Sequence, residues 1–369
     1  MVARALPTVD RGGIQTHVWE LGRALSELGA EVTLYLHRAP YPKDLPFEVV
    51  QVPFVAAPRF TAMQYLTASL MSGLLLKGRR FDVVHGHSMY GWGASVAGSW
   101  PFVLTCHGTQ LNELRYIDST AFDPFHIATD FVSYRMERWA AGRADRIITM
   151  CQENSRDVHD QYGVPEGIIR AIPPGIHPQR FSEARPEGPF VLSVGRLYPR
   201  KGLGHLLRAM PAVLARVPEA RLLLAGRGES EAELRALAKE LGLGDAVEFL
   251  GHVPDDALPA LYSRAAVFAM PSVYEGYGLV MLEAMASGLP VVAFRTGGAP
   301  ELVRDGETGF LADPATLGDR LARVLEDAAK ARAMGRRARE EALAGYTWPT
   351  IAKRTLAVYE EAIAAAAAR

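Results

Sequence analysis

The stretch that decides the fold runs from Glu275 to Met285 and reads Glu-Gly-Tyr-Gly-Leu-Val-Met-Leu-Glu-Ala-Met. It follows an apolar run, Val267–Met270, and leads into a segment with helical periodicity, so it predicts the turn from a buried parallel strand into a helix. Two glycines at a helix start let the backbone approach a ligand, and the free amides there favour a phosphate. Glu275 and Glu283 bracket this turn, and we expect them to reach opposite ends of one ligand. Glu283 is flanked by apolar residues, so its carboxylate needs polar partners.

The same alternation of short apolar runs and helical patterns extends along the whole chain. Continuous apolar runs predict strands covered on both faces, and strands that alternate with helices predict parallel sheets with right-handed crossovers. His17–Leu28 is a predicted helix, because its apolar residues share one face and Gly29 follows as a stop. The expected strands are Val2–Leu6, Val32–Leu36, Val83–His85, Phe102–Cys106, Arg146–Met150, Phe190–Val194, Arg221–Ala225, Val247–Leu250, Val267–Met270 and Pro290–Phe294.

The strand–helix pattern is interrupted between Pro173 and Pro189, where proline and glycine are frequent and no periodicity is visible. This composition predicts a linker. A chain of 369 residues exceeds what one hydrophobic core usually organises, so we expect two α/β domains, residues 1–178 and residues 179–349. Such open sheets bind ligands at the carboxyl ends of their strands, and two facing domains would bring those ends together across one cleft.

Composition narrows the classes of function. Lys and Arg number 40 against 41 Asp and Glu, for a net charge of −1, and this balance does not indicate a nucleic-acid-binding protein. Cys106 and Cys151 each lie at or near the end of an apolar run, as buried free thiols do. With no signal peptide and no uncharged apolar stretch of ~20 residues, we expect a cytoplasmic protein without a membrane span.

A second motif, Gly195-Arg196-Leu197-Tyr198-Pro199-Arg200-Lys201-Gly202, follows the first predicted strand of the second domain. It therefore lies at the ligand-binding edge of that sheet. Arginine binds two phosphate oxygens through its fork and lysine acts as a point charge, so Arg196 and Lys201 are predicted to hold a diphosphate. Arg200 is interpreted as a surface charge.

These motifs together resemble the family 4 retaining glycosyltransferases, and the resemblance covers nearly the whole chain. It rests on the spacing of Glu275 and Glu283, the Gly-Arg-Leu…Lys-Gly loop at Gly195–Gly202, and Gly12-Gly13 in the first loop. Three further stretches add to it: Arg221–Gly228 with its Leu-Leu-Leu-Ala-Gly-Arg-Gly run, Gly297-Gly298-Ala299-Pro300-Glu301, and Tyr346-Thr347-Trp348. Pro173-Pro174-Gly175-Ile176 departs from the Pro-Asn-Gly-Val of many relatives, which affects only the linker.

The resemblance implies the GT-B fold, two facing Rossmann-like domains with a cleft between them. The N-terminal domain is then on the acceptor side, the C-terminal domain binds the nucleotide sugar, and a helix over residues 350–369 packs back on the N-terminal domain.

The resemblance also implies roles for individual residues. Arg196 and Lys201 would bind the donor diphosphate, Glu283 the ribose, and Glu275 the transferred sugar. His107, which follows a predicted strand, would face that sugar as well. We take Arg196, Lys201, Glu275 and His107 as the catalytic set. The remaining donor-binding candidates are backbone positions at two turns: Gly12, Gly13, Gly276, Gly278, Leu279 and Val280.

The acceptor is expected to contact the N-terminal domain, where the candidates are Gln15, Thr109 and Arg115, with Thr16, His87, Ser88 and Asn112 nearby in sequence. It would be a carbohydrate, another small molecule or a lipid-linked sugar. The run Gly12–Val18 looks like that of phosphatidylinositol mannosyltransferases, among others. A lipid-phosphate acceptor at the inner face of the plasma membrane is therefore one hypothesis. The segment Tyr65–Arg80 ends in Lys77, Arg79 and Arg80, and it is interpreted as an ordinary domain helix in preference to an amphipathic helix that touches a membrane.

No cofactor or metal is expected. Many glycosyltransferases hold a divalent metal with an Asp-x-Asp motif, which this sequence lacks, since Asp255 and Asp256 are adjacent. Cationic side chains would replace the metal at the leaving diphosphate. His85 and His87 are close in sequence, but we expect their imidazoles to point apart beyond the end of a strand, so no metal site is predicted there.

The predicted reaction is transfer of a hexose from a nucleotide-diphosphate sugar to a hydroxyl group, with retention of configuration as the family implies. GDP-mannose and UDP-glucose are the leading donors. A dehydrogenase is disfavoured because no Gly-x-Gly-x-x-Gly follows the first strand. A disaccharide phosphorylase and a non-catalytic sugar-nucleotide-binding subunit remain as alternatives.

Overall fold

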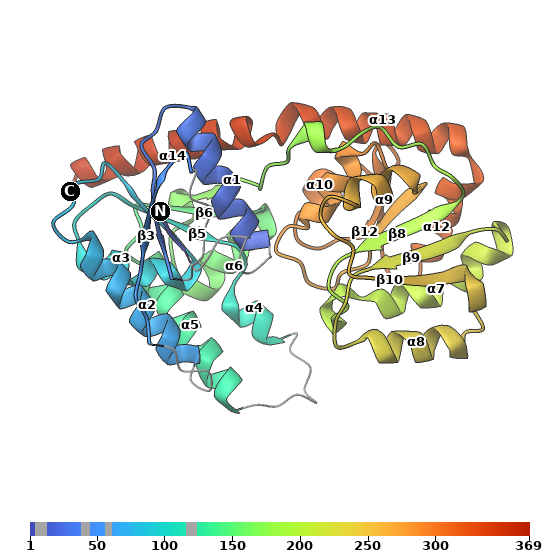
Figure 1. The fold of residues 1–369 in the computed structure, drawn as a ribbon, viewed down its shortest axis with the longest axis horizontal. Coiled ribbons are helices and arrows are strands. Elements are labelled where there is room, and N and C mark those ends of the chain that lie inside the picture. The colour runs from blue at the N-terminus through green and yellow to red at the C-terminus, as the bar shows by residue number, and fades with distance from the viewer. Residues whose placement is uncertain (4–12, 38–44, 56–60, 116–123) are drawn as a thin grey trace. The chain divides into compact units, whose positions relative to one another are not determined.

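The computed structural model describes residues 1–3, 13–37, 45–55, 61–115 and 124–369, and the side chains of residues 61, 113–115 and 124–127 are not described. The chain divides into two compact units (Figure 1). Unit 1 comprises Met1–Gly175 and Trp348–Arg369, and unit 2 comprises Ile176–Thr347. Each unit contains its own parallel sheet and its own core.

Unit 1 contains a seven-stranded sheet in the order β3-β2-β1-β4-β5-β6-β7, and every described pair of neighbouring strands is parallel. Its elements are β1 Val2–Ala3, α1 Gly13–Glu27, β2 Thr33–Leu36, β3 Glu48–Gln51, α2 Thr61–Leu76, β4 Val84–His87, α3 Trp92–Ala97, β5 Phe102–Cys106, α4 Gln110–Arg115, α5 Pro124–Ala141, β6 Arg146–Thr149, α6 Gln152–Tyr162, β7 Ile169–Ala171 and α14 Trp348–Ala367.

Helices cover both faces of this sheet, and the alternation of side chains along each strand decides which residues meet which helices. On one face, Ala3 and Leu34 pack with Val18 of α1. On the other face, Val2 and Tyr35 pack in the core that includes residues of α2, α3 and α5, which lie together in Figure 1. Both cysteines are buried and form no disulfide, as predicted.

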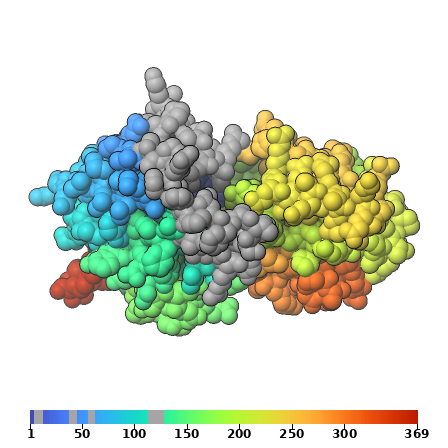
Figure 2. All heavy atoms as spheres, turned by 90° about the horizontal axis from the view of Figure 1, so that it is seen from below, coloured from blue at the N-terminus to red at the C-terminus, as the bar shows by residue number. Residues whose placement is uncertain are grey.

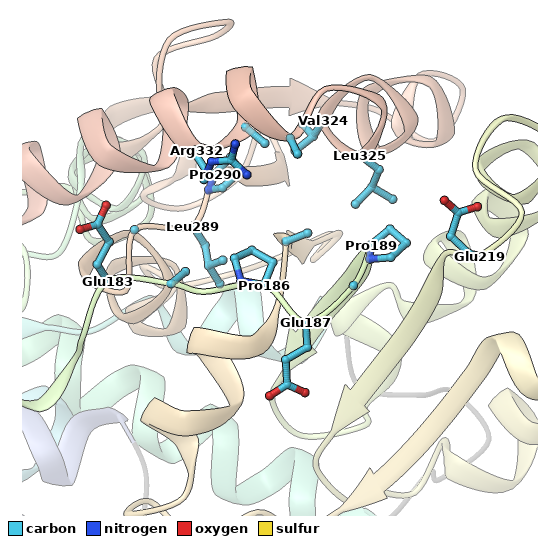
Figure 3. Close-up of a pocket in the computed structure, with 16 residues that line it drawn as sticks. Glu183, Pro186, Glu187, Pro189, Glu219, Leu289, Pro290, Val324, Leu325 and Arg332 are labelled. Carbon is cyan, nitrogen blue, oxygen red and sulfur yellow. The ribbon is translucent and has the colours of Figure 1, made fainter.

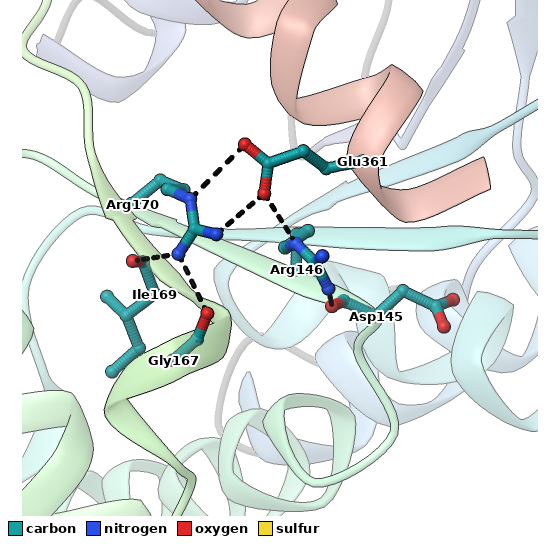
Figure 4. A network of polar contacts seen from close by, with 6 residues as sticks. All are labelled: Asp145, Arg146, Gly167, Ile169, Arg170 and Glu361. Carbon is teal, nitrogen blue, oxygen red and sulfur yellow. Dashed lines mark hydrogen bonds and ion pairs between the residues drawn. The ribbon is translucent and has the colours of Figure 1, made fainter. Parts of the chain in front are cut away.

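The C-terminal helix α14 packs on α1 and on the strands β5 and β6. Its buried side chains include Trp348, Ile351 and Tyr359. A charged network joins its last turns to the start of two strands (Figure 4): Glu361 accepts hydrogen bonds from Arg146 at 2.8 Å and from Arg170 at 2.7 Å. Apolar burial and these ion pairs together fasten the helix to unit 1.

Unit 2 contains a six-stranded sheet in the order β10-β9-β8-β11-β12-β13, and its described neighbouring pairs are likewise parallel. Its elements are β8 Phe190–Val194, α7 Leu203–Arg216, β9 Arg221–Ala225, α8 Glu231–Glu240, β10 Val247–Gly251, α9 Leu258–Arg264, β11 Val267–Met270, α10 Leu279–Ala286, β12 Val291–Phe294, α11 Ala299–Leu302, β13 Gly309–Ala312, α12 Leu317–Glu326 and α13 Ala328–Gly345.

The expected fold class, two Rossmann-like domains with parallel sheets, is confirmed, and each expected strand has a counterpart in the structure. Three strands were not predicted: β3, β7 and β13. Each lies at an edge of its sheet. β3 begins with Glu48 and is partly exposed, so it lacks the continuous apolar run that marks a central strand.

Candidate functional site

An ion pair in unit 2 joins two of the residues predicted to bind the donor. Lys201 follows β8, Glu275 follows β11, and the ammonium of Lys201 donates a hydrogen bond to the Glu275 carboxylate. Their side chains are only 17% and 12% exposed. Burial pushes the pKa of Glu275 upward, but Lys201, Arg200 and the amide of Gly276 outweigh it, so the pKa lies below its usual value. Glu275 is therefore an ionised acceptor at the carboxyl edge of the sheet.

The two arginines of the same loop differ in their surroundings. Arg196 is exposed, and its guanidinium carbon lies 4.9 Å from the centre of the Tyr198 ring. Arg196 and Lys201 line one small hollow together with the ends of β8 and β9. Arg200, interpreted from the sequence as a surface charge, is 18% exposed, lies 3.9 Å from the Glu275 carboxylate and donates to the Tyr274 carbonyl. The sequence shows that residue 200 carries a charge. It does not show that the loop with Tyr274 and Glu275 covers the Arg200 side chain.

Backbone contacts hold the loops of this site together. The Leu197 amide donates to the Arg227 carbonyl at 3.0 Å, and the Val273 amide donates to the Arg200 carbonyl at 2.9 Å. Gly226, at φ +146°, lies so close to this loop that a Cβ atom would come within 1.8 Å of the Gly195 carbonyl oxygen. Only glycine fits there, so the glycine-rich run after β9 is part of the site's framework.

The helix predicted from the deciding stretch is α10, and Gly278 precedes its first residue. The amides of Leu279 and Val280 lie in its first turn, where backbone donors lack partners within the helix. Glu283 accepts a hydrogen bond from the Tyr262 hydroxyl at 2.8 Å. Burial raises the pKa of Glu283 to about 7, against the lowering effects of Tyr262 and Arg180. Neutral pH therefore lies near the midpoint of its titration.

Four histidines lie close together in unit 1: His17 in α1, His85 and His87 in β4, and His107 directly after β5. His87 Nδ1 lies 3.1 Å from His107 Nε2, a hydrogen-bond distance. The ring of His17 lies 5.0 Å from that of His107, and the rings of His85 and His87 are 4.4 Å apart. The expectation that His85 and His87 point apart is wrong. β4 extends through His87, and residues two apart in a strand lie on the same face.

Burial is the main cause that keeps each of these histidines neutral. Burial lowers the pKa of His17 to about 4, and burial together with the neighbouring histidines lowers the pKa of His107 well below its ordinary value. The Tyr359 hydroxyl lies 2.7 Å from His85 Nδ1, and the Thr105 hydroxyl lies 2.6 Å from His85 Nε2. The cluster therefore offers hydrogen-bonding groups without net charge.

The predicted acceptor residues fall at the same edge of unit 1. Gln15 lies buried in the first turn of α1, and Thr109 is buried just before α4. The Thr109 hydroxyl has no hydrogen-bond partner among the described residues. Arg115 ends α4, and its side chain lies outside the described part of the structure. Gly12 also lies outside the described residues, whereas Gly13 begins α1.

The residues that lie near the predicted acceptor residues in sequence differ in their hydrogen bonds, backbone conformation and burial. Asn112 donates to Asp157 at 2.8 Å and accepts from Gln161 at 3.0 Å, so both ends of its amide already bond to α6. Ser88 follows β4 with φ at +49°, an uncommon backbone state for a residue other than glycine. Thr16 is half-buried in α1. Asn112 is thus held as a structural link, while Ser88 turns the chain at the carboxyl edge of the sheet.

A separate cavity of about 360 Å³ lies at the opposite, amino edge of the unit 2 sheet (Figure 3). Pro186, Leu289 and Pro290 line it together with Leu325 of α12 and Arg332 of α13. None of the predicted site residues that the structure describes lines this cavity. Among the described residues, no group of three or more His, Cys, Asp or Glu side chains is arranged to hold a metal ion.

Two residues of the candidate site were not predicted from the sequence: Tyr262, which bonds to Glu283, and His17, which packs on His107. A third, Arg200, was interpreted as a surface charge but lies beside Glu275. Tyr262 and His17 lie in helices, α9 and α1, and reach the site only through tertiary packing. A polar residue in an otherwise apolar helix face, as at His17, was the one available signal.

Comparison with known proteins gives two family matches that together span most of the chain. Residues 177–341 match the model of glycosyl transferases group 1, and residues 11–180 match that of glycosyltransferase family 4. The D-inositol 3-phosphate glycosyltransferase of Acidothermus cellulolyticus is 31% identical over 96% of this chain and 87% of its own length.

Two further relatives illustrate the range of similarity. The GDP-mannose-dependent alpha-(1-6)-phosphatidylinositol monomannoside mannosyltransferase of Mycobacterium tuberculosis is 36% identical over 57% of this chain and 60% of its own length. Among solved structures, the sucrose-phosphate synthase of Thermosynechococcus elongatus superposes with a TM-score of 0.79 at 26% identity, covering 96% of this chain and 94% of that one.

Proposed function

The chain belongs to glycosyltransferase family 4 and is a transferase that uses a nucleotide sugar, and from this premise we propose a specific reaction. In it, a hexose passes from a nucleotide-diphosphate sugar to an acceptor hydroxyl with retention of configuration and without a metal. The observation that carries the proposal is the cluster of Lys201, Glu275 and Arg196 at the carboxyl edge of unit 2, beside the amino end of α10.

The proposed chemistry follows from the charges in this cluster. The bond between the anomeric carbon and the β-phosphate oxygen breaks, and a bond from the acceptor oxygen to that carbon forms. Negative charge grows on the leaving diphosphate, where Arg196, Lys201 and the α10 amides stabilise it. The acceptor hydroxyl proton passes to the leaving phosphate. Glu275 accepts hydrogen bonds from the transferred sugar, Glu283 accepts them from the ribose, and His107 contacts the transferred sugar.

For the donor we propose GDP-mannose ahead of UDP-glucose. The relative that shares 36% identity over 57% of this chain is named as GDP-mannose-dependent, and its name and that of the A. cellulolyticus relative both include an inositol phosphate group. We therefore propose an acceptor that carries a phosphorylated polyol, either free or as a lipid headgroup. Gln15 and Thr109 are its proposed contacts.

Contact with a membrane surface is a further part of the proposal. The structure has no helix within its described residues that would span a bilayer. However, Leu70, Leu74 and Leu75 of α2 are exposed, as are Phe131 and Trp139 of the adjacent α5. Both helices lie at the surface of unit 1 in Figure 2, in light blue and green. Sedimentation with vesicles containing phosphatidylinositol tests this, and equal recovery with and without vesicles would remove the lipid-linked acceptor from the proposal.

A thermal-shift screen in EDTA tests the donor site. GDP, UDP, ADP, dTDP and their sugar conjugates would be compared on the wild type, Lys201→Ala and Glu283→Ala, with Glu187→Ala at the opposite edge of the sheet as a control. A ligand at about 100 times its Kd adds ~2.7 kcal/mol of stability. We expect GDP to raise the Tm of the wild type and the control but not of the site variants.

Turnover then separates the alternatives. Release of GDP from GDP-mannose on addition of an inositol phosphate, with an α-linked product by NMR, would support the proposal. Stabilisation by phosphate with a disaccharide, and no nucleotide effect, would favour the phosphorylase. Nucleotide binding without turnover on any acceptor would favour a non-catalytic subunit.

A further inference from the structure

The hydrogen bond between His87 and His107 couples the protonation of two neighbouring rings. His87 ends β4, and His107 directly follows β5, the next strand in the sheet. His87 Nδ1 and His107 Nε2 are 3.1 Å apart, and the rings are tilted by only 22°. Between two neutral imidazoles, one nitrogen must donate and the other must accept. The direction of this bond therefore fixes the tautomer of both residues.

The surroundings of His87 decide the direction. Its second nitrogen, Nε2, is buried and has no hydrogen-bond partner within the described structure. If His107 donated, His87 would carry its proton on Nε2 as a buried N–H without an acceptor. Orphaned buried donors are rarer than underused acceptors. His87 therefore carries its proton on Nδ1 and donates it to His107 Nε2.

The direction of this bond also determines which nitrogen of His107 carries the proton. Since its Nε2 accepts a bond, neutral His107 carries its proton on Nδ1. His107 is only partly buried, whereas His87 is fully buried, so His107 is the member of the pair that can reach a ligand. His17 packs edge-on against His107, with ring centres 5.0 Å apart. This contact and the bond from His87 hold the ring in place from within unit 1.

We propose that His87 is a positioning residue that holds His107 in the tautomer that donates a hydrogen bond from Nδ1 to a substrate oxygen. In this state His107 is a hydrogen-bond donor and not a general base. The inference rests on the proposed function for the role of His107 toward substrate. The tautomer itself is a property of the free protein and is tested without turnover.

Long-range ¹H–¹⁵N NMR of the full chain, labelled at its ten histidines, tests the tautomer. His107→Gln assigns the His107 signals by their loss. We expect His107 in the wild type to show a pyrrole-like Nδ1 and a pyridine-like Nε2. His87→Asn keeps an N–H donor near the position of Nδ1 and should preserve this pattern, whereas His87→Leu should shift it toward a mixture of tautomers. A proton on His107 Nε2 in the wild type, or identical His107 signals in His87→Leu, would overturn the proposal.

Kinetics provide the second readout. We expect His87→Leu to lower kcat about 3- to 10-fold, the range for one hydrogen bond, with little change in the donor KM. His87→Asn should recover most of the loss, which a purely structural role would not predict. If no nucleotide sugar is turned over at all, the proposed function fails while the NMR result still decides the positioning role. Should His87→Leu fail to fold, the wild-type and His87→Asn spectra decide it.

Discussion

The two units place opposite kinds of chemistry at the carboxyl edges of similar sheets. In unit 2 that edge carries ionised groups, Lys201 and Glu275, paired with each other and supported by Arg200. In unit 1 it carries neutral imidazoles, and the ion pairs of Arg146 and Arg170 with Glu361 of α14 lie at the amino edge, where Arg146 begins β6 (Figure 4). The charged side chains of unit 2 suit a leaving diphosphate, which gains negative charge during the reaction. The neutral imidazoles of unit 1 suit hydroxyl groups, which gain none.

The two edges also differ in how many of their polar atoms already have hydrogen-bond partners within the protein. In the unit 2 loops, backbone groups of one loop bond to those of another, as in the pair of Val273 and Arg200, although the Ser272 hydroxyl is buried without a partner among the described residues. In unit 1, His17 Nδ1, His87 Nε2 and Thr109 Oγ1 are buried without a partner among the described residues. Unpaired buried polar groups are costly unless something else satisfies them. The unit 2 loops are thus linked to one another through their backbones, and the histidine edge of unit 1 has more unused capacity for hydrogen bonds.

Lys201→Ala gives the sharpest test of this comparison. Removing one group that stabilises a developing charge typically costs ~2.7–4 kcal/mol, so kcat/KM should fall about 10²- to 10³-fold. Lys239→Ala removes an exposed lysine of α8 in the same unit and should leave kcat/KM unchanged. A loss below tenfold for Lys201→Ala would mean that the charge of unit 2 is not the main source of catalysis.

Gly226→Ala tests the organisation of the unit 2 loops. The added Cβ would collide with the Gly195 carbonyl, in a backbone state that side chains rarely adopt. We expect a loss of roughly 1–3 kcal/mol of unfolding free energy, seen as a lower Tm by differential scanning calorimetry. Gly167→Ala in unit 1 is the matched control, because its Cβ would meet open space at an ordinary φ. Equal Tm values for the two variants would show that the loop contacts at Gly226 are not restrictive.

The pH dependence of nucleotide binding tests the electrostatics of unit 2. Burial raises the pKa of Glu283 to about 7, and ribose hydroxyls bond best to its ionised form. Nucleotide affinity should therefore rise with pH and weaken by about tenfold between pH 8 and pH 6. The raised pKa has the opposite effect on folding: the contribution of protonated Glu283 to stability is present below its unfolded pKa and is lost as the pH rises through about 7.

Titration calorimetry at several pH values measures both the affinity and the proton release. Glu283→Gln should bind more weakly and show no such pH dependence. Tyr262→Phe removes the hydrogen bond that lowers the pKa of Glu283, so it should move the transition to higher pH. A transition that stays in place in Glu283→Gln would assign the titration to another group.

The sequence predicted the fold well, and it predicted the two unit 2 loops whose residues Lys201 and Glu275 come into contact, because both depend on local patterns. β11 is a continuous apolar run and β8 is apolar except for Ser193, and Gly202 and Gly278 mark the loops that follow them. The edge strand β13 gives a weaker signal, since Gly309–Ala312 begins with glycine. The strand was predicted to end at His85, whereas β4 extends to His87. This error led to the wrong prediction for the orientation of the His85 and His87 side chains.

The unit 1 cluster could not be predicted in the same way because its members come from separate elements. His17 lies in α1, His85 and His87 in β4, His107 after β5, and Tyr359 in α14 near the end of the chain. Only the packing of the sheet and of the C-terminal helix brings them together. Arg200 was misjudged for the same reason, because its partner Glu275 lies 75 residues further along the chain.

Glu361→Gln should give the smallest effect and tests whether the charges of unit 1 are purely structural. Glu361 is 37% exposed, and its pKa is lowered by hydrogen bonds from Arg146 and Arg170. Exposed ion pairs contribute about 0–1 kcal/mol, so the Tm should fall by only a few degrees at neutral pH and kcat/KM should not change. Because a lowered pKa gives stability that is lost as the pH falls through it, the Tm difference between wild type and variant should shrink below about pH 4. A drop in kcat/KM without a drop in Tm would place catalytic charge in unit 1 and break the division between the two sheets.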